Sequence, residues 1–183
     1  MSEEFDSSKP PPSDLLKDAY DRCAHHIESR YGVDVMISDV LEPNTGDFNG
    51  MTILVDHDQN LDTALFVLIH LFGHTAQWNV SEEYRALGHD VTPGLSEDEL
   101  ARIYTYERDA TRISLALLHE VGVTNLDQWV SDWWYADWKY LQHFYRTGEK
   151  LDFHSLLQPG AERLTPSQIP AFEPQRWISR WSF

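Results

Sequence analysis

ALFVLIHLFGH, residues 64–74, is the most apolar stretch of the chain and the one on which the fold depends. It is apolar nearly all round at helical spacing, which predicts a central buried helix over residues 61–79. Its two histidines, His70 and His74, are four residues apart, so on a helix both rings project from one face about 6 Å apart. That spacing lets two imidazoles reach one tetrahedral metal ion.

Two histidines in a buried helix have a second interpretation, as core residues that are hydrogen-bonded to the backbone or to other side chains. The context of His70 and His74 favours the metal. The flanking residues are all apolar and offer few polar partners, and an unpaired buried imidazole is costly. The flanking residues are Phe66, Val67, Leu68, Ile69, Leu71 and Phe72.

A second helix supplies a third candidate ligand. Ser96 and Glu99 form a capping-box pattern for a helix that ends near Gly122. Glu107 lies in the middle of its apolar stripe, where a carboxylate needs a cation or several hydrogen bonds. Pairing with an arginine or a tyrosine is the alternative, but two histidines on one buried helix and a glutamate on another make a metal the simpler account. The stripe consists of Leu100, Ile103, Tyr104, Ala110, Ser114, Leu117, Leu118 and Val121.

From about Val33 to Leu118 the chain resembles the ImmA/IrrE-type metallopeptidases, a gluzincin-like group whose pattern is HExGH followed by ExxAxxFAxxLL. Both histidines, Gly73, Glu107, Ala110 and the leucine pair match, whereas Ile113 and Ser114 replace the Phe-Ala step. The resemblance implies a zincin-like fold in which one zinc ion, Zn²⁺, is held by the same His70, His74 and Glu107.

Leu71 is the departure that matters most. The family has a glutamate here that takes a proton from the metal-bound water, and leucine cannot exchange protons. A degenerate peptidase that acts through a protein partner is therefore the preferred hypothesis. The alternative is an active zinc-dependent protease that cuts a polypeptide substrate with a non-standard general base. The possible substitutes by residue type are Glu82, Glu83, His119 and His143.

Composition limits the other possibilities. The formal net charge of −16 argues against direct binding to nucleic acid or to anionic membranes. Cys23 is the single cysteine, so a disulfide within the chain and a thiolate metal site are excluded, and a reducing compartment is favoured. The first residues lack an apolar stretch typical of a secretion signal, and we expect a cytoplasmic protein.

The expected architecture is α+β, with a small N-terminal sheet, a central metal-binding helix and a helical C-terminal part. Residues 1–12 are predicted to be a disordered leader, and residues 13–183 a single domain. Ser13 or Asp14 is expected to cap a first helix that runs to Tyr31. Further predictions are strands at 33–38 and 51–55, in a hairpin or a small mixed sheet, with turns at 44–46 and 49–50 between them. A loop is predicted over 81–95, which contains Gly88, Pro93 and Gly94. A helix is predicted over 124–146, followed by irregular chain from 148 with a short strand at 177–181.

Several motifs carry weaker signals. Asp56-His57-Asp58 is typical of a solvated turn, with cation binding as the alternative. His89-Asp90 is similar to the paired residues of HD-type phosphohydrolases, but those need a helix and a loop is predicted here. Surface or structural roles are expected for His25-His26 beside Cys23.

The helix over 124–146 is rich in tryptophan and aspartate. Its tryptophans repeat at helical spacing, which favours a core face; a surface that docks a partner or covers the metal cleft is the alternative. They are Trp129, Trp133, Trp134 and Trp138. Its aspartates, Asp127, Asp132 and Asp137, are expected to form its solvated side.

Overall fold

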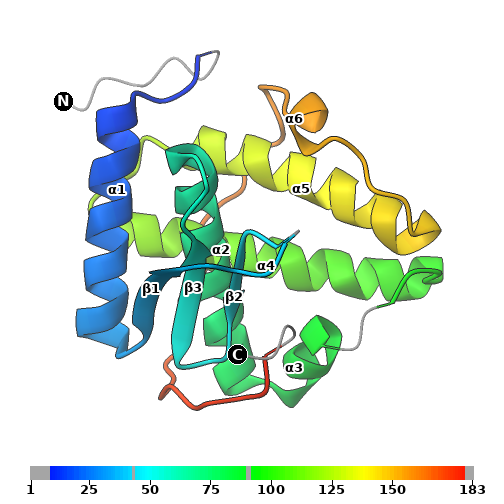
Figure 1. Cartoon of the computed structure of the whole chain (residues 1–183), viewed down its shortest axis with the longest axis horizontal. Helices are drawn as coiled ribbons and strands as arrows, with labels where there is room; N and C mark the ends of the chain where they lie inside the picture. Colours follow the sequence, from blue (N-terminus) through cyan, green and yellow to red (C-terminus); the bar gives the residue numbers. More distant parts are fainter. Residues whose placement is uncertain (1–8, 43, 90–91, 180–183) are drawn as a thin grey trace.

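A three-stranded mixed sheet precedes the central helix in the computed structural model, which describes residues 9–42, 44–89 and 92–179. The strands are β1 (Asp34–Ser38), β2 (Gly46–Phe48) and β3 (Thr52–Asp56), in the order β1-β3-β2 (Figure 1). β1 pairs with β3 in parallel and β2 pairs with it antiparallel. The small mixed sheet is thus confirmed. The prediction of a turn at Gly46 was wrong, since this residue begins the edge strand β2.

The first helix, α1 (Ser13–His26), continues into a π-helical turn, η1 (Ile27–Tyr31), and ends at Gly32. Gly32 has a φ of 67°, the left-handed conformation that glycine adopts most readily. The predicted caps were wrong, because Ser13 and Asp14 lie inside the first turn. Pro12 occupies the N-cap, and its carbonyl accepts from the Leu16 amide at 3.1 Å.

The central helix, α2 (Leu61–Val80), packs on the sheet, on α1 and on the long helix α4 (Glu97–Glu120). α4 begins with the predicted capping box, in which Ser96 and Glu99 bond reciprocally. The last long helix, α5 (Asp127–Thr147), lies beside α4 (Figure 1). The α+β architecture is confirmed, with α2 at its centre.

Residues 81–95, predicted to be a loop, contain a helix, α3 (Glu82–His89). The Ser81 hydroxyl accepts from the Tyr84 amide at 3.2 Å, and two glutamates follow it in the first turn. Both features favour helix initiation. Gly88 and Pro93 had hidden this signal, although only Pro93 lies beyond the helix.

After residue 147 the described chain has one short helix, α6 (Phe153–Leu156), and is otherwise irregular. The Trp177 amide donates to the Asn49 carbonyl at 2.7 Å, so this segment returns to the β2–β3 turn. Residues 177–179 do not form the predicted strand, and the rest of that prediction lies outside the described residues, as do residues 1–8 of the predicted leader.

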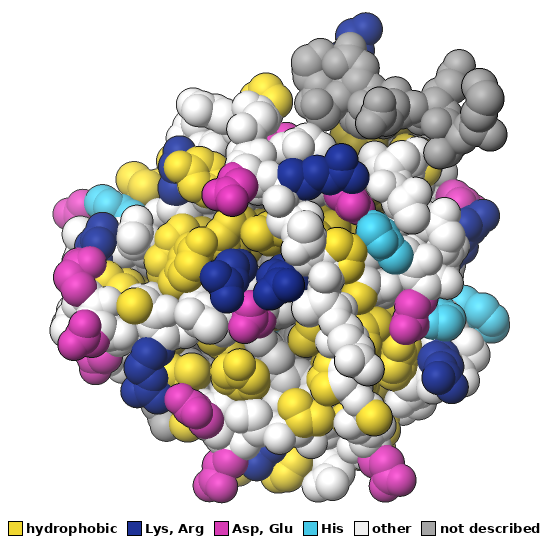
Figure 2. Space-filling model, turned by 180° about the vertical axis from the view of Figure 1, so that it is seen from behind, with side chains coloured by type: hydrophobic (Ala, Val, Ile, Leu, Met, Phe, Trp, Pro, Cys, Tyr) yellow, Lys and Arg dark blue, Asp and Glu magenta, His cyan; other side chains and the backbone are white. Residues whose placement is uncertain are grey.

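The surface mixes charges of both signs with apolar areas, as the face seen from behind in Figure 2 shows. Within the described ranges, no helix combines the length and the apolar character needed to cross a bilayer.

Candidate metal centre

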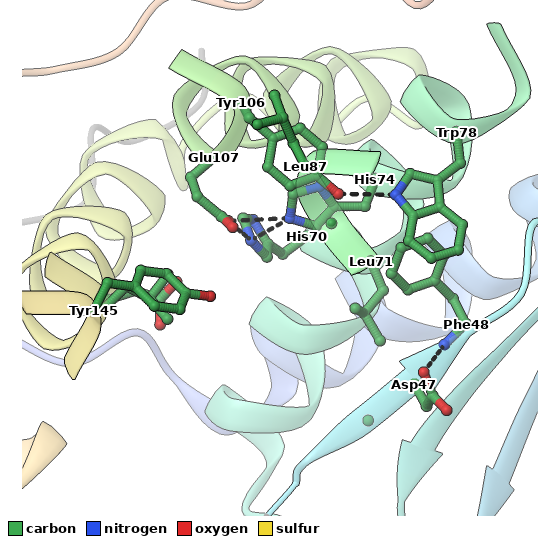
Figure 3. A pocket seen from close by; sticks show the side chains of 14 residues that line it. Asp47, Phe48, His70, Leu71, His74, Trp78, Leu87, Tyr106, Glu107 and Tyr145 are labelled. Carbon is green, nitrogen blue, oxygen red and sulfur yellow. Dashed lines mark hydrogen bonds and ion pairs between the residues drawn. The ribbon is translucent and has the colours of Figure 1, made fainter. Parts of the chain in front are cut away.

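Three side chains from two helices meet at one point (Figure 3). His70 and His74 project from α2, and Glu107 projects from α4. The Glu107 Oε2 atom lies 3.0 Å from His70 Nε2 and 3.0 Å from His74 Nε2, and the two Nε2 atoms are 3.0 Å apart. All three residues are buried, with exposed fractions of 9%, 5% and 8% for His70, His74 and Glu107.

Gly73 makes this meeting possible. A Cβ atom at this position would lie 2.2 Å from the Ala110 carbonyl oxygen, so the backbones of α2 and α4 are in direct contact here. Gly73 lies next to His74 in α2, and Ala110 lies one helical turn after Glu107 in α4. The Ser114 hydroxyl joins the helices further, by donating to the Ile69 carbonyl at 2.7 Å. The glycine of the HxxGH motif therefore has a packing role that brings the three ligands together.

Gln77 determines which nitrogen of His74 carries the proton. Its amide NH₂ group donates to the Tyr106 carbonyl at 2.9 Å, which turns its Oε1 atom toward His74. His74 Nδ1 lies 2.9 Å from that oxygen and must therefore donate to it. In the neutral ring, Nε2 is left with a lone pair that faces the other two side chains.

Thr111 acts on His70 in the same way. Its hydroxyl donates to the Glu107 carbonyl at 3.1 Å, and its oxygen lies 3.3 Å from His70 Nδ1. That oxygen accepts from Nδ1–H, so the proton of the neutral His70 ring is also directed away from the cluster. Partners that orient ligand histidines through Nδ1 are typical of protein metal sites.

The donor set fits a divalent metal ion. Two imidazole lone pairs and one carboxylate oxygen converge, which is repulsive unless a cation lies among them. Ligand atoms about 2.0–2.1 Å from a tetrahedral zinc are roughly 3.3 Å apart, close to the 3.0 Å separations found here. Burial tends to raise the pKa of Glu107, but the neighbouring His74 and His70 lower it below its usual range, so the carboxylate is anionic. The buried cluster could thus hold a metal ion.

Two cavities meet at the cluster, with volumes of about 200 Å³ and 430 Å³. Both are lined by His70, Leu71, Gly46 and Asp137. Among the described residues, no fourth histidine, cysteine or carboxylate joins the three ligand atoms. One side of the site is therefore open to a cleft.

Leu71 lies in the wall of both cavities, and it offers no group there that could accept a proton. None of the four substitutes suggested by residue type lines either cavity. Glu83 pairs with Arg102 at 3.0 Å, and His119 lies 2.8 Å from Asp127. Glu82 is exposed on α3, and His143 lies 3.8 Å from Glu149.

Asp137 of α5 borders both cavities. Instead of lying on a solvated side, it is partly buried in the cleft wall and interacts electrostatically with His70 and Glu107. Burial raises its pKa to about 7; His70 opposes this rise and Glu107 adds to it. Across the described chain, its carboxylate makes no hydrogen bond or ion pair.

The spacing of the three aspartates already excluded a common solvated side. Five residues turn a helix by about 140° past a full turn, so Asp127, Asp132 and Asp137 point in three directions. Asp127 is 5% exposed and pairs with Arg163 at 3.0 Å, while Asp132 accepts from the Ala161 amide at 2.8 Å. Asp127 and Asp132 therefore hold the C-terminal segment against α5. The prediction of solvent exposure was wrong for all three aspartates.

The tryptophans of α5 are core residues, as the helical spacing favoured. All four are buried, with exposed fractions from 5% to 8%. Trp133 also lines the larger cavity, where its ring lies 5.4 Å from that of Phe66. The cleft is thus covered in part by this helix.

The weaker motifs lie away from the metal cluster. The Asp56 carboxylate accepts from the Val40 amide and the Gln59 side chain at 3.2 Å and 2.9 Å, so it orders a turn. Ligand atoms of Asp39, Asp56 and His57 also lie within 4.8 Å of one another near the surface, but both oxygens of Asp56 already accept these two hydrogen bonds. His26 binds Glu120 at 2.9 Å. His89 ends α3 rather than lying in a loop, and Asp90 is outside the described residues.

Comparisons with family models, with curated proteins and with solved structures find no match to this chain. The resemblance to the ImmA/IrrE-type metallopeptidases thus stays a prediction that rests on the motif residues.

Proposed function

We propose that this chain is a zincin-like metal-binding protein that holds one zinc ion at His70, His74 and Glu107 and receives a polypeptide in the adjoining cleft. The observation that carries the proposal is the arrangement of the histidines. Gln77 and Thr111 accept from the Nδ1 atoms, so both Nε2 lone pairs meet the Glu107 carboxylate. In a hydrogen-bonded core network, at least one of the two Nε2 atoms would instead have to carry a hydrogen and donate it to the Glu107 carboxylate.

Zinc suits two imidazoles and one carboxylate, and when bound it polarises a water molecule or a carbonyl group. The polypeptide follows from the resemblance and from the cleft. Phe66, Trp133 and Phe153 line the 430 Å³ cavity beside His70, so it would accept an apolar side chain. In a degenerate peptidase, this cleft would bind a protein partner without cutting it.

Hydrolysis of the bound polypeptide is the second candidate function, and the openness of the site favours it. Structural zinc sites have four protein ligands, whereas catalytic sites keep one position free for water or substrate. The described cluster has three ligands and opens on two cavities. Leu71 argues for the degenerate protein, so the two functions are separated by whether another residue accepts the proton.

The first experiment is metal analysis of protein that is purified without added metal or chelator. We expect about one zinc per chain in the wild type and in Asp98→Asn, an exposed change on α4. Glu107→Ala should lose most of the metal. A wild type that contains no metal, even after zinc is supplied, would refute the proposal.

The polypeptide is tested separately, with a fluorescent mixture of random-sequence peptides and zinc-loaded protein. Thr63 lines the larger cavity on the first turn of α2, so Thr63→Trp should fill it. We expect weaker peptide binding by this variant at an unchanged zinc content. Equal binding by Thr63→Trp and wild type would exclude this cavity as the polypeptide site.

A further inference from the structure

Asp137 faces the metal cluster from a third helix. α2 and α4 provide the three ligands, and α5 places Asp137 where both cavities meet, beside His70 and Leu71. Its carboxylate interacts electrostatically with His70 and Glu107 and has no hydrogen bond within the described residues. The carboxylate of Asp137 is partly buried, borders both cavities and is not occupied by a structural hydrogen bond from the described chain, so it is available to a ligand or to a reacting water molecule.

The packing of α5 holds Asp137 at this position. Trp133, one turn earlier, packs on Phe66 of α2 with a ring separation of 5.4 Å. Trp138, the next residue, packs on Tyr104 of α4 at 5.1 Å. The residues on either side of Asp137 thus contact both helices that carry the ligands. Packing in the core, and not the conformation of a loop, determines where Asp137 lies relative to the cluster.

Asp137 is not a fourth ligand in this arrangement. Ligand atoms that share one ion, each about 2.0–2.2 Å from it, are at most about 4.4 Å apart. The ligand atoms of His70, His74 and Glu107 lie within 4.8 Å of one another, and no carboxylate oxygen of Asp137 lies within that distance of all three. Its carboxylate therefore lies outside the first coordination sphere while bordering the same cleft.

We infer that Asp137 is the proton acceptor of this site and substitutes from α5 for the carboxylate that is missing at position 71. This inference rests on the proposed function, and it makes the chain a hydrolase rather than a degenerate peptidase. The substrate class is a peptide or another carboxylic acid derivative whose carbonyl carbon can be attacked by water.

The proton balance of the reaction is complete with water as the only co-reactant. Asp137 takes a proton from a water molecule in the cleft while the water oxygen bonds to the carbonyl carbon of the substrate. The protonated Asp137 then gives that proton to the amide nitrogen as the carbon–nitrogen bond breaks. A carboxylic acid and an amine leave, and the Asp137 carboxylate is restored.

The test compares wild type, Asp137→Asn and the matched Asp98→Asn after cobalt substitution, with acetohydroxamic acid as the probe. Acetohydroxamic acid binds metals as its anion, so a neighbouring group must accept its proton. The visible cobalt spectrum reports its binding. We expect Asp137→Asn to bind the probe about 10- to 100-fold more weakly than the wild type does, because the probe loses its hydrogen bond to the Asp137 carboxylate.

A second readout follows the hydrolysis of 4-nitrophenyl acetate by the zinc-loaded proteins. We expect the rate to fall by about 10²- to 10⁴-fold in Asp137→Asn and to stay unchanged in Asp98→Asn. The double variant Leu71→Glu/Asp137→Asn should recover part of that loss, because it returns a carboxylate to the site at position 71. A general defect in folding would not be rescued in this way.

The outcomes separate this inference from the proposed function. A wild type without metal overturns both. If the wild type holds one metal ion and Asp137→Asn loses most of it, Asp137 is a metal ligand. That result overturns this inference and leaves the proposed function intact. Metal retention with unchanged probe binding and unchanged hydrolysis in Asp137→Asn also overturns it.

Discussion

Replacing Gly73 by alanine tests the helix contact that builds the metal centre. The added Cβ atom would lie 2.2 Å from the Ala110 carbonyl oxygen and 2.7 Å from its carbonyl carbon. Both atoms belong to the backbone of α4, so no side chain can turn aside. The helices would have to separate locally by about 1 Å to restore an ordinary contact.

The expected loss of stability is the difference between two effects. Overpacking of a tight core contact costs about 1–3 kcal/mol, and a backbone contact belongs at the upper end. Alanine in a helix recovers about 1 kcal/mol relative to glycine. We therefore expect Gly73→Ala to reduce the free energy of unfolding by about 2 kcal/mol, measured by urea denaturation of the metal-free protein.

The same change should weaken zinc binding. His74 follows Gly73 directly, and its Nε2 atom is 3.0 Å from Glu107 Oε2 across the same contact. Separating the helices by about 1 Å places Glu107 beyond the bonding range of an ion held by both histidines. Competition with a chromophoric chelator should show a lower affinity in Gly73→Ala than in wild type.

Ala101→Gly is the matched control, since Ala101 is exposed in the first half of α4. It measures the helix propensity alone, and we expect a loss of about 1 kcal/mol with unchanged zinc affinity. If Gly73→Ala were as stable as wild type, or more stable, the close approach of α2 and α4 would be refuted.

Three further predictions concern single contacts. Gln77→Leu removes the acceptor of His74 Nδ1, and chelator competition should show about 10- to 100-fold weaker zinc binding; unchanged affinity would contradict the assigned tautomer. Cys23 is fully buried, and burial raises its pKa to about 12, so a thiol reagent at mildly alkaline pH should label it readily only after denaturation. Asp132→Ala leaves the Gly160 and Ala161 amides without their acceptor, which should lower the free energy of unfolding by about 1–3 kcal/mol and speed limited proteolysis near these residues. Equal proteolysis of Asp132→Ala and wild type would show that this anchor is dispensable.

Much of the local structure could be predicted because it depends on neighbouring residues. The periodicity around His70 predicted α2 to within one residue at its C-terminal end, and Ser96 with Glu99 correctly marked the start of α4. α3 was missed because Gly88 was interpreted as a sign of a loop, whereas the capping hydroxyl of Ser81 was overlooked.

Glu107 and Asp137 have the same local sequence signal, although burial was predicted for Glu107 and exposure for Asp137. Glu107 was assigned to the core because it lies in an apolar stripe. Asp137 also lies in one, since Trp133 and Leu141 are one helical turn away on either side. This spacing of apolar residues indicates that Asp137 lies toward the interior.

The sequence by itself determined that two histidines share one face of a buried helix and that a glutamate lies on the buried face of another. Those facts depend on the 3.6-residue repeat of the helix, which is local. Only the tertiary structure decided that the three atoms meet within 3.0 Å, that the site is open, and that Asp137 borders it. Distances between residues on different helices depend on how closely and at what angle the helices pack, and side chains far apart in the chain determine that packing together.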